Sequence, residues 1–300
     1  MLQKYNEANK DIYVWVGQQL VHRDEAKISV FDSAVQGGDA VWEGIRVYEE
    51  GLLKLDEHLD RLYNSAKTLA FQGIPERSFI VDAIRATLLK NKMYKDTHIR
   101  LTLTRGEKIT SGMDPRLNQK GCTLIVLAEW KAPVYDNNKG ITVITSHIRR
   151  NGPQFLDSKI HHNNLLNNIL AKIQANIAGV DAALMLDDRG FAAELNGTNI
   201  FMIQNNTVLT PRAVACLPGI TRQHIIDICQ ENNIPCIEKD ISLTELYAAD
   251  AVFCTGTMGE LTPIQAIDGR DTKSESNYLL FEKLVQLHRG SFKRYCTPFV

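Results

Sequence analysis

The sequence predicts an α+β protein of two domains, and two observations support this prediction. Before residue 130, short β-rich runs flank two long segments in which apolar residues recur with the helical period. Residues 131–140 then interrupt the periodicity with Pro, paired Asn and Gly, after which strand and helix patterns alternate again. We therefore expect an N-terminal α+β domain over 1–130, an interdomain linker over 131–140 and a C-terminal domain over 141–300.

The N-terminal domain should begin with a small antiparallel sheet. Strand patterns cover 12–16 and 27–30, and Gly17 suits a turn between paired strands. The first helix is expected from its N-cap Asp56 to about 73–75, because its apolar residues follow the helical period. The remaining elements expected here are a helix over 76–93 and strands over 97–105 and 121–130.

The C-terminal domain should mix strands with helices. One helix is expected over 164–178 and a second after Thr221. A third should begin at Ser242-Leu-Thr-Glu245, because Ser and Glu three residues apart form a capping box. The strands expected in this domain lie at 141–148, 182–186, 191–195, 200–203, 251–254 and 264–267.

Charge and cysteine content exclude several classes of protein. With 34 basic and 35 acidic residues, the formal net charge of −1 favours neither nucleic acid nor an acidic membrane surface as a partner. Six cysteines, none in a Cys-x-x-Cys pair, indicate buried free thiols in a reducing cytosol. The sequence shows neither an apolar secretory segment nor the run of about 18 apolar residues that spans a membrane. We therefore expect a cytoplasmic protein, complete as it stands.

Common phosphate-loop, dinucleotide and zinc-protease motifs are absent from the sequence. The pair His161-His162 resembles metal ligands at first sight. However, adjacent side chains of a helix or strand point apart, and no Cys, His or carboxylate cluster lies nearby in sequence. We therefore expect no bound metal.

Two loops rich in Thr and Gly suggest a site for an anion. Residues 217–222 lead into a helix, so the N–H groups of Ile220 and Thr221 and the Thr221 hydroxyl would converge on an anion at the positive end of the helix dipole. Residues 255–260 follow a strand and offer further backbone and hydroxyl donors. Ordinary turn and N-cap chemistry explains either loop alone, whereas the two together favour a bound phosphate.

Lys159 and Glu194 are candidates for covalent and acid-base chemistry. A buried lysine has a lowered pKa and can attack a carbonyl as a free amine, although an exposed loop lysine fits the position of Lys159 equally. Glu194 ends an apolar run, where a carboxylate needs a partner if it is buried. A half-exposed strand end is the alternative for Glu194.

Six blocks of sequence, taken in order, resemble the class IV (fold-type IV) pyridoxal-phosphate-dependent aminotransferases, and most closely the branched-chain amino acid aminotransferases. The blocks lie at 41–46, 57–62, Lys159, 194–201, 217–222 and 255–263. The resemblance implies a small α/β sandwich domain and a larger pseudo-barrel domain that binds pyridoxal 5'-phosphate. It also implies ping-pong transamination between an amino acid and a 2-oxo acid such as 2-oxoglutarate, in a homodimer or an assembly of dimers.

The resemblance also assigns roles to individual residues. Lys159 would bind the cofactor covalently and shuttle a proton, and Glu194 would pair with the pyridine nitrogen. Arg61 would bind the phosphate together with residues of both Thr/Gly loops, and Thr198 and Asn199 would lie beside the ring. The full set of implied cofactor-binding residues is Arg61, Lys159, Glu194, Thr198, Asn199, Leu217, Ile220, Thr221 and Thr257.

The sequence departs from the branched-chain pattern where the substrate binds. Asn164, Gly37 and His98 stand where tyrosines are expected, and Trp42 replaces a phenylalanine of the side-chain pocket. Arg100 is retained, so we expect the substrate carboxylate to meet Arg100, a protonated His98 and backbone N–H groups. The implied substrate-binding residues are Trp42, His98, Arg100, Thr257 and Met258.

A branched-chain amino acid is the first expectation for the substrate. A D-amino acid or (R)-amine transaminase and an aminodeoxychorismate lyase-like enzyme are the alternatives within the family. A phosphate-ligand binding protein without catalysis is the alternative from another class.

Overall fold

The computed structural model describes residues 4–272 and 278–300, which form two compact units. The C-terminal unit contains Pro133–Lys159 and Leu165–Ser291. The N-terminal unit contains the described residues up to Ala132, together with Ile160–Asn164 and Phe292–Val300. Two segments that follow the expected linker in sequence therefore belong to the N-terminal unit.

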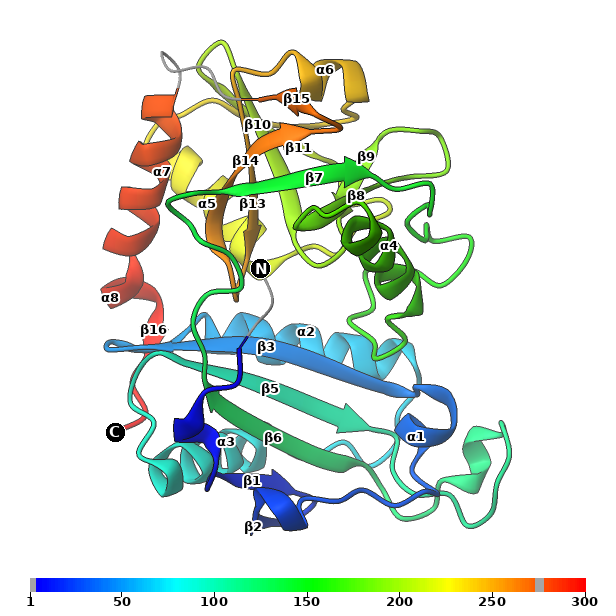
Figure 1. Cartoon of the computed structure of the whole chain (residues 1–300). Helices are drawn as coiled ribbons and strands as arrows, with labels where there is room; N and C mark the ends of the chain where they lie inside the picture. The colour runs from blue at the N-terminus through cyan, green and yellow to red at the C-terminus, as the bar shows by residue number, and fades with distance from the viewer. Residues whose placement is uncertain (1–3, 273–277) are drawn as a thin grey trace. The chain divides into compact units, whose positions relative to one another are not determined.

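The N-terminal unit is built on one antiparallel sheet with the strand order β16-β4-β3-β5-β6-β1-β2 (Figure 1). Its strands are β1 (Tyr13–Val16), β2 (Gln19–His22), β3 (Ala40–Tyr48), β4 (Gly51–Leu53), β5 (Thr97–Thr104), β6 (Thr123–Trp130) and β16 (Cys296–Thr297). Its helices are α1 (Ser33–Gly37), α2 (Leu55–Thr68), α3 (Arg77–Asn91) and α8 (Phe292–Tyr295), with short 3-10 turns at Glu7–Asn9, Arg23–Glu25 and Pro115–Leu117.

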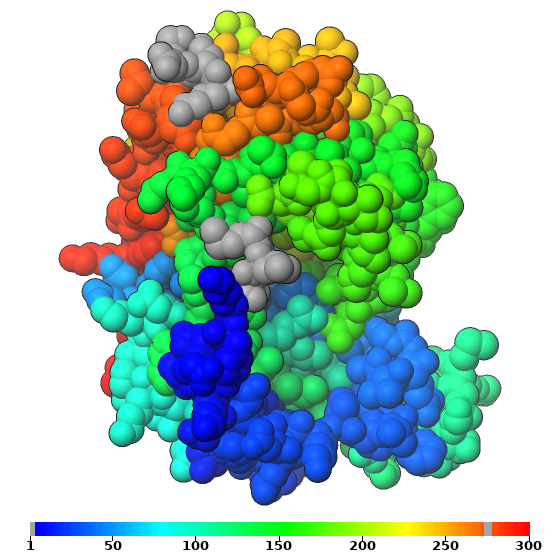
Figure 2. Space-filling model, viewed as in Figure 1, coloured from blue at the N-terminus to red at the C-terminus, as the bar shows by residue number. Residues whose placement is uncertain are grey.

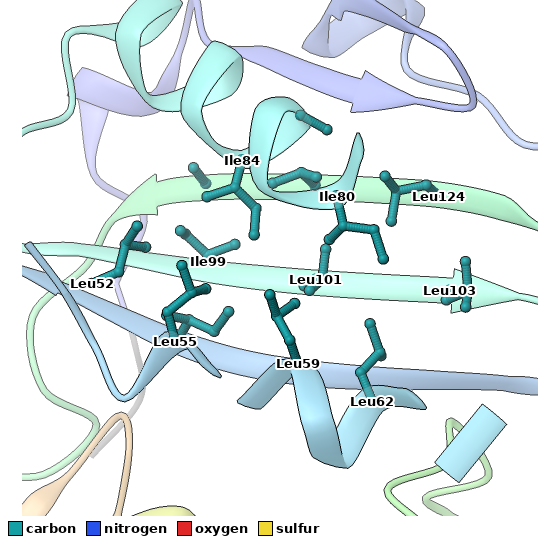
Figure 3. Packing of buried hydrophobic residues seen from close by; sticks show 14 of the residues in the cluster. Leu52, Leu55, Leu59, Leu62, Ile80, Ile84, Ile99, Leu101, Leu103 and Leu124 are labelled. Carbon is teal, nitrogen blue, oxygen red and sulfur yellow. The ribbon is translucent and has the colours of Figure 1, made fainter. Parts of the chain in front are cut away.

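The core of this unit lies between the sheet and its two long helices. Helix α2 packs on β3, while α3 packs on β6 and β1, and their leucines and isoleucines meet those of the central strands (Figure 3). Strand side chains alternate between faces, so Val41, Ile45 and Val47 of β3 point into this core. The same alternation places Glu43 on the helix-facing side of β3 and Trp42 on the opposite side.

The C-terminal unit contains a larger mixed sheet with the order β12-β11-β10-β13-β14-β7-β8-β9, and β15 added beside β14. The edge strand β9 also packs against β10 and β11, so the sheet curls back on itself. Its strands are β7 (Ile141–Thr145), β8 (Ala182–Leu186), β9 (Ala192–Leu195), β10 (Asn199–Gln204), β11 (Thr207–Pro211), β12 (Cys236–Lys239), β13 (Ala251–Gly256), β14 (Glu260–Ile267) and β15 (Arg270–Asp271). Its helices are α4 (Leu166–Ile177), α5 (Ile220–Glu231), α6 (Leu243–Tyr247) and α7 (Tyr278–Gly290). This mixture of helices and strands confirms the predicted α+β class.

Some predicted elements are wrong in detail. Residues 27–30 do not form a strand, because they pair with no neighbour and Val30 remains 71% exposed; β2, directly after the Gly17 turn, pairs with β1 instead. Helix α2 begins at Leu55 after Lys54, which has a left-handed backbone, so Asp56 is not the N-cap. Asp56 lies instead in the first helical turn, where its negative charge favours the helix dipole.

The helix start predicted at Ser242 is confirmed. The capping box at Ser242 and Glu245 forms both of its hydrogen bonds. All six cysteines are free, although only Cys216, Cys229 and Cys254 are fully buried. None of the helices in the described parts of the chain is long and apolar enough to cross a membrane. Within residues 4–272 and 278–300, no three His, Cys, Asp or Glu side chains gather as metal ligands would.

Candidate active site

Glu194 is the buried carboxylate of the C-terminal unit. It lies on β9 opposite Met185 of β8, and only 5% of the residue is exposed. The Nε of Arg150 donates to Glu194 Oε1 at 2.6 Å, and both side chains are almost completely buried. A buried Glu194 was expected to need a partner, and Arg150 is that partner. The partner comes from a loop 44 residues earlier in the chain, so no local pattern marks it.

Asn199, the first residue of β10, connects Glu194 with the loop before α5. Its Nδ2 donates to Glu194 Oε2 at 3.2 Å and to the carbonyl of Leu217 at 2.9 Å. A Cβ atom at Gly219 would lie 2.0 Å from Asn199 Oδ1, so only glycine allows this close approach. The structure therefore brings Glu194, Asn199 and Leu217 together.

Helix α5 begins at Ile220 without a hydrogen bond from a capping side chain. The first N–H groups of a helix have no partner within it, and the helix dipole makes this end positive. Its N-cap residue is Gly219, which has no side chain to occupy the space in front of the helix. Ile220 and Thr221 thus occupy the positions from which backbone N–H groups bind an anion.

The turn after β13 lies beside the same residues. Thr255 is paired with Asn199 in the sheet, and a Cβ atom at Gly256 would lie 3.0 Å from Cγ2 of Thr198. The Oγ1 of Thr255 is buried without a hydrogen-bond partner among the residues that the structure describes. The N–H of Val134 donates to the carbonyl of Met258 at 2.9 Å, which fixes the turn from the linker side.

Lys159 lies in the loop before α4, and 43% of its side chain is exposed. Its Nζ is 3.5 Å from the carbonyl oxygen of Val214 and 3.5 Å from Asp157 Oδ1. Val214 is only three residues before Leu217, so the amine lies near the chain segment that leads into α5. The structure therefore shows a partly exposed lysine rather than a buried one.

Arg61 lies in a buried charged cluster of the N-terminal unit. Its Nε and Nη2 donate to the two carboxylate oxygens of Glu43 at 2.8 and 2.7 Å. The Nδ1 atoms of His58 and His161 lie 2.7 and 3.2 Å from the same carboxylate. Although burial raises the pKa of Glu43, the charges and hydrogen bonds of Arg61 and His161 outweigh it and hold this pKa well below its usual value. The carboxylate is therefore an anion at neutral pH.

Neither Glu43 nor His58 could be identified from the sequence, because each is an ordinary residue until the fold places it beside Arg61.

Trp42 and Arg100 form a stack on the opposite face of the same sheet. The guanidinium carbon of Arg100 lies 3.4 Å from the centre of the Trp42 ring, and the His161 ring lies 4.1 Å from the indole. The Nη2 of Arg100 donates to Asn163 Oδ1 at 2.9 Å. No carboxylate of the described residues forms an ion pair with Arg100, and burial lowers its pKa to about 10. Arg100 is thus a desolvated cation held by an aromatic ring and an amide.

His98 differs from the prediction. Burial lowers the pKa of His98 to about 3, and positive neighbours reinforce the shift, so the imidazole is neutral at neutral pH. The expectation that a protonated His98 binds a carboxylate is therefore wrong. The other two positions at which tyrosine is replaced, Gly37 and Asn164, are exposed in their unit.

Comparison with known proteins identifies the family of this chain. The sequence pattern described as amino-transferase class IV matches residues 40–267. The chain is 59% identical over 262 residues to branched-chain-amino-acid aminotransferase-like protein 2 of Arabidopsis thaliana, covering 87% of this chain and 47% of the relative. It is 40% identical over 258 residues to a putative branched-chain-amino-acid aminotransferase of Methanocaldococcus jannaschii, covering 86% of this chain and 88% of the relative.

Solved structures show the same fold. The branched-chain aminotransferase of Thermoproteus uzoniensis with norvaline matches with a TM-score of 0.85 and 28% identity, over 97% of this chain and all of the other. A branched-chain amino acid aminotransferase from T.th. with pyridoxamine 5'-phosphate matches with a TM-score of 0.87 and 31% identity, over 97% and 99% of the two chains. The chain spans about half the length of the first two curated relatives. With a pattern match over most of its length and relatives of this similarity, the chain belongs to the class IV aminotransferase family.

Proposed function

We propose that this chain is a pyridoxal 5'-phosphate-dependent aminotransferase that exchanges an amino group between an amino acid and a 2-oxo acid. The observation that carries the proposal is the Asn199 side chain, which donates to Glu194 and to the Leu217 carbonyl. One amide thereby joins the carboxylate assigned to the ring nitrogen with the loop that begins the phosphate-binding helix.

The residues of the C-terminal unit fit this cofactor. Helix α5 begins without a side-chain cap, and Gly219 lets the backbone lie close to a ligand. The partnerless hydroxyl of Thr255 suits an acceptor such as a phosphate or ring oxygen. We infer that Ile220, Thr221 and Thr257 would bind the phosphate, and we assign Arg61 to the same phosphate from the family resemblance.

Each functional residue then has a distinct task. When bound, the cofactor supplies a carbonyl that captures the amine and a ring that withdraws electrons from the substrate α-carbon. Lys159 would hold the cofactor covalently and then take the proton from the substrate α-carbon at Nζ. Glu194 would keep a proton on the ring nitrogen, because Arg150 and Asn199 hold its carboxylate in a fixed orientation.

For the substrate we propose an amino acid with a branched apolar side chain as the first candidate, as the names of the relatives suggest. Arg100 would bind its carboxylate together with the backbone N–H groups of Thr257 and Met258. The stack of Arg100 on Trp42 supports this role, because a guanidinium held flat on a ring keeps its N–H edge for an anion. The neutral His98 would contribute no charge to this binding.

We also propose a homodimer or an assembly of dimers, in the cytoplasm. The support is an apolar stripe on α4, formed by side chains with the helical spacing that are about half exposed or more. These are Leu166, Ile169, Leu170, Ile173 and Ile177. Figure 2 shows helix α4 on the surface of this face, and the exposed fractions of the five side chains leave the stripe open to a partner. A second set of exposed apolar residues lies in helix α1 and in loops of the N-terminal unit, at Val30, Val35, Ile109 and Met113. The six free thiols suit a reducing compartment.

Replacing Lys159 tests the central proposal. We expect Lys159→Ala to fold normally but to lose the visible absorption of the covalently bound cofactor and essentially all transamination, because no other group of the proposed site supplies both the covalent link and the proton transfer. The exposed Lys139 of the linker provides a matched control, and Lys139→Ala should retain both signals. Turnover of Lys159→Ala within tenfold of the wild type would contradict the assignment.

Glu194→Gln should separate a chemical role from a structural one. The variant should keep the cofactor but slow the single-turnover reaction with the amino donor by at least tenfold, because an uncharged ring nitrogen withdraws electrons less well. It should also lower the free energy of unfolding by about 3 kcal/mol, since Arg150 would remain buried without its anion.

Denaturant unfolding of Glu107→Gln, which breaks the exposed Lys120 ion pair, gives the control and should change stability by less than about 1 kcal/mol. Unchanged single-turnover rates in Glu194→Gln would leave Glu194 a structural role only.

Arg100→Lys tests recognition of the carboxylate. An ammonium cannot donate two parallel hydrogen bonds, so KM for amino acids should rise at least tenfold while cofactor affinity changes little. An amine substrate without a carboxylate is the control, and its KM should not change. An equal effect on the amine would show that Arg100 is only structural.

Ile173→Glu tests the proposed subunit interface. A charge in the middle of the α4 stripe should convert the assembly to monomers in light scattering, because a buried unpaired carboxylate opposes association. Leu279→Glu on α7 changes an equally apolar residue that is 72% exposed, and it should leave the assembly intact. An active wild-type monomer would refute the proposal.

A further inference from the structure

The N-terminal unit contains a cavity of about 310 Å³ on the face of its sheet opposite α3. Strand β6 gives every second side chain to the core beneath α3, so Ile125 and Leu127 point to this other face. Together with Val14 and Val16 of β1, they line the cavity with aliphatic side chains. Pockets that hold small molecules have volumes of about 300–1,000 Å³, so this cavity suits a ligand of few atoms.

Two cations in the wall of this cavity have no counter-ion. Neither Arg23 nor Lys27 forms an ion pair with a carboxylate in the parts of the chain that the structure describes. The Nη1 of Arg23 donates to the carbonyl of Asn9, whereas its Nε and Nη2 donate to no atom of the same parts of the chain. A guanidinium with these donors beside apolar walls favours an anionic group on the ligand.

A carboxylate lies at the same end of the cavity as Arg23. The guanidinium of Arg23 contacts Asn9, whose side chain forms two hydrogen bonds with the backbone of Trp130. Trp130 follows Glu129 directly on β6, and Glu129 also lines the cavity. The Nζ of Lys131 lies 3.4 Å from Glu129 Oε2, and Oε1 accepts no hydrogen bond from residues 4–272 and 278–300. This end of the cavity therefore offers donors to an anion and an acceptor to a cation.

We propose that this cavity binds a free α-amino acid with an apolar side chain, with its carboxylate on Arg23 and its ammonium on Glu129. An α-amino acid carries both charges on one carbon atom, which matches a cation and a carboxylate at one end of the cavity. Its side chain would lie along the aliphatic walls, where burial of apolar surface is favourable. A ligand with only one of the two charges would remove a protein charge from water without compensation.

The cavity is separate from the proposed substrate site, although it lies beside it. Leu127 is the cross-strand partner of Arg100, so the two side chains lie on the same face of the sheet. The residues that line the cavity are all different from those that the family resemblance implies for cofactor and substrate. Binding in the cavity therefore requires neither the cofactor nor Lys159.

Methyl NMR measures binding at this site directly. The cofactor-loaded protein is titrated with leucine in the absence of a 2-oxo acid, and we expect saturable shifts of the methyl signals of Val14, Val16, Ile125 and Leu127. Two probes each lack one charge: 4-methylpentanoic acid has no ammonium, and 3-methylbutylamine has no carboxylate. Each should bind at least tenfold more weakly than leucine.

Charge variants identify which group of leucine each residue recognises. Glu129→Gln should weaken leucine binding at least tenfold but leave the affinity for 4-methylpentanoic acid within twofold. Arg23→Gln should weaken both of these ligands and leave 3-methylbutylamine within twofold. If Arg23→Gln does not fold, Glu129→Gln still tests the proposal, because its ion pair with Lys131 is partly exposed.

Two control variants separate this site from its surroundings. Glu25→Gln removes an exposed charge two residues after Arg23 that does not line the cavity, and it should change none of the affinities. Arg100→Lys should leave leucine binding in the cavity within twofold, although it should weaken binding of the substrate.

Four results would overturn the inference. Methyl signals that do not move at about 10 mM leucine would exclude a site with a Kd of about 1 mM or tighter. Equal affinities for leucine and both probes would leave only an apolar cavity. Signals that respond to protein concentration but not to leucine would show that a second copy of the chain fills the cavity. A response lost in Arg100→Lys would show that the methyl groups report the substrate site. Intact leucine binding without transamination would contradict only the proposed function.

Discussion

The burial of carboxylates is the constraint on which both halves of this molecule depend. An anion removed from water must be neutralised and must have its lone pairs satisfied, or the fold loses several kcal/mol. In the C-terminal unit Glu194 meets this requirement with Arg150 and Asn199. In the N-terminal unit Glu43 meets it with Arg61 and two imidazoles. Each carboxylate therefore determines the orientation of several polar neighbours.

Because Asn199 satisfies Glu194 with one proton of its amide group and the Leu217 carbonyl with the other, the loop before α5 is fixed relative to the sheet. Because Gly219 lies close to Asn199, the first residue of α5 is also fixed relative to the sheet. The pairing of Thr255 with Asn199 places the next turn beside it. Three segments far apart in sequence thus lie side by side, and the phosphate site proposed above would use the backbone donors of the loop before α5 and of the turn after β13.

Sequence reasoning found what is local and missed what is long-range. The capping box at Ser242 and the start of α5 near Thr221 are marked by their own residues, and the structure has both. Residues 27–30 have the composition of a strand but no partner, because whether a segment pairs depends on the rest of the fold. Arg150 could not be assigned to Glu194 for the same reason. The family resemblance supplied the assignments of Lys159 and Arg61, which composition and spacing alone do not distinguish from ordinary surface residues.

The neutral state of His98 changes which residues can bind a substrate carboxylate. With tyrosine absent and His98 uncharged, the positive charge offered to a carboxylate by the implied substrate-binding residues rests on Arg100. Stacking on Trp42 restricts the guanidinium to donation along its edge, and Asn163 already occupies one of its N–H donors. The His161 ring contacts the Trp42 ring of this stack, and its Nδ1 atom also contacts the Glu43 carboxylate. Trp42 on one face of this sheet and Glu43 on the other therefore share one imidazole neighbour, His161.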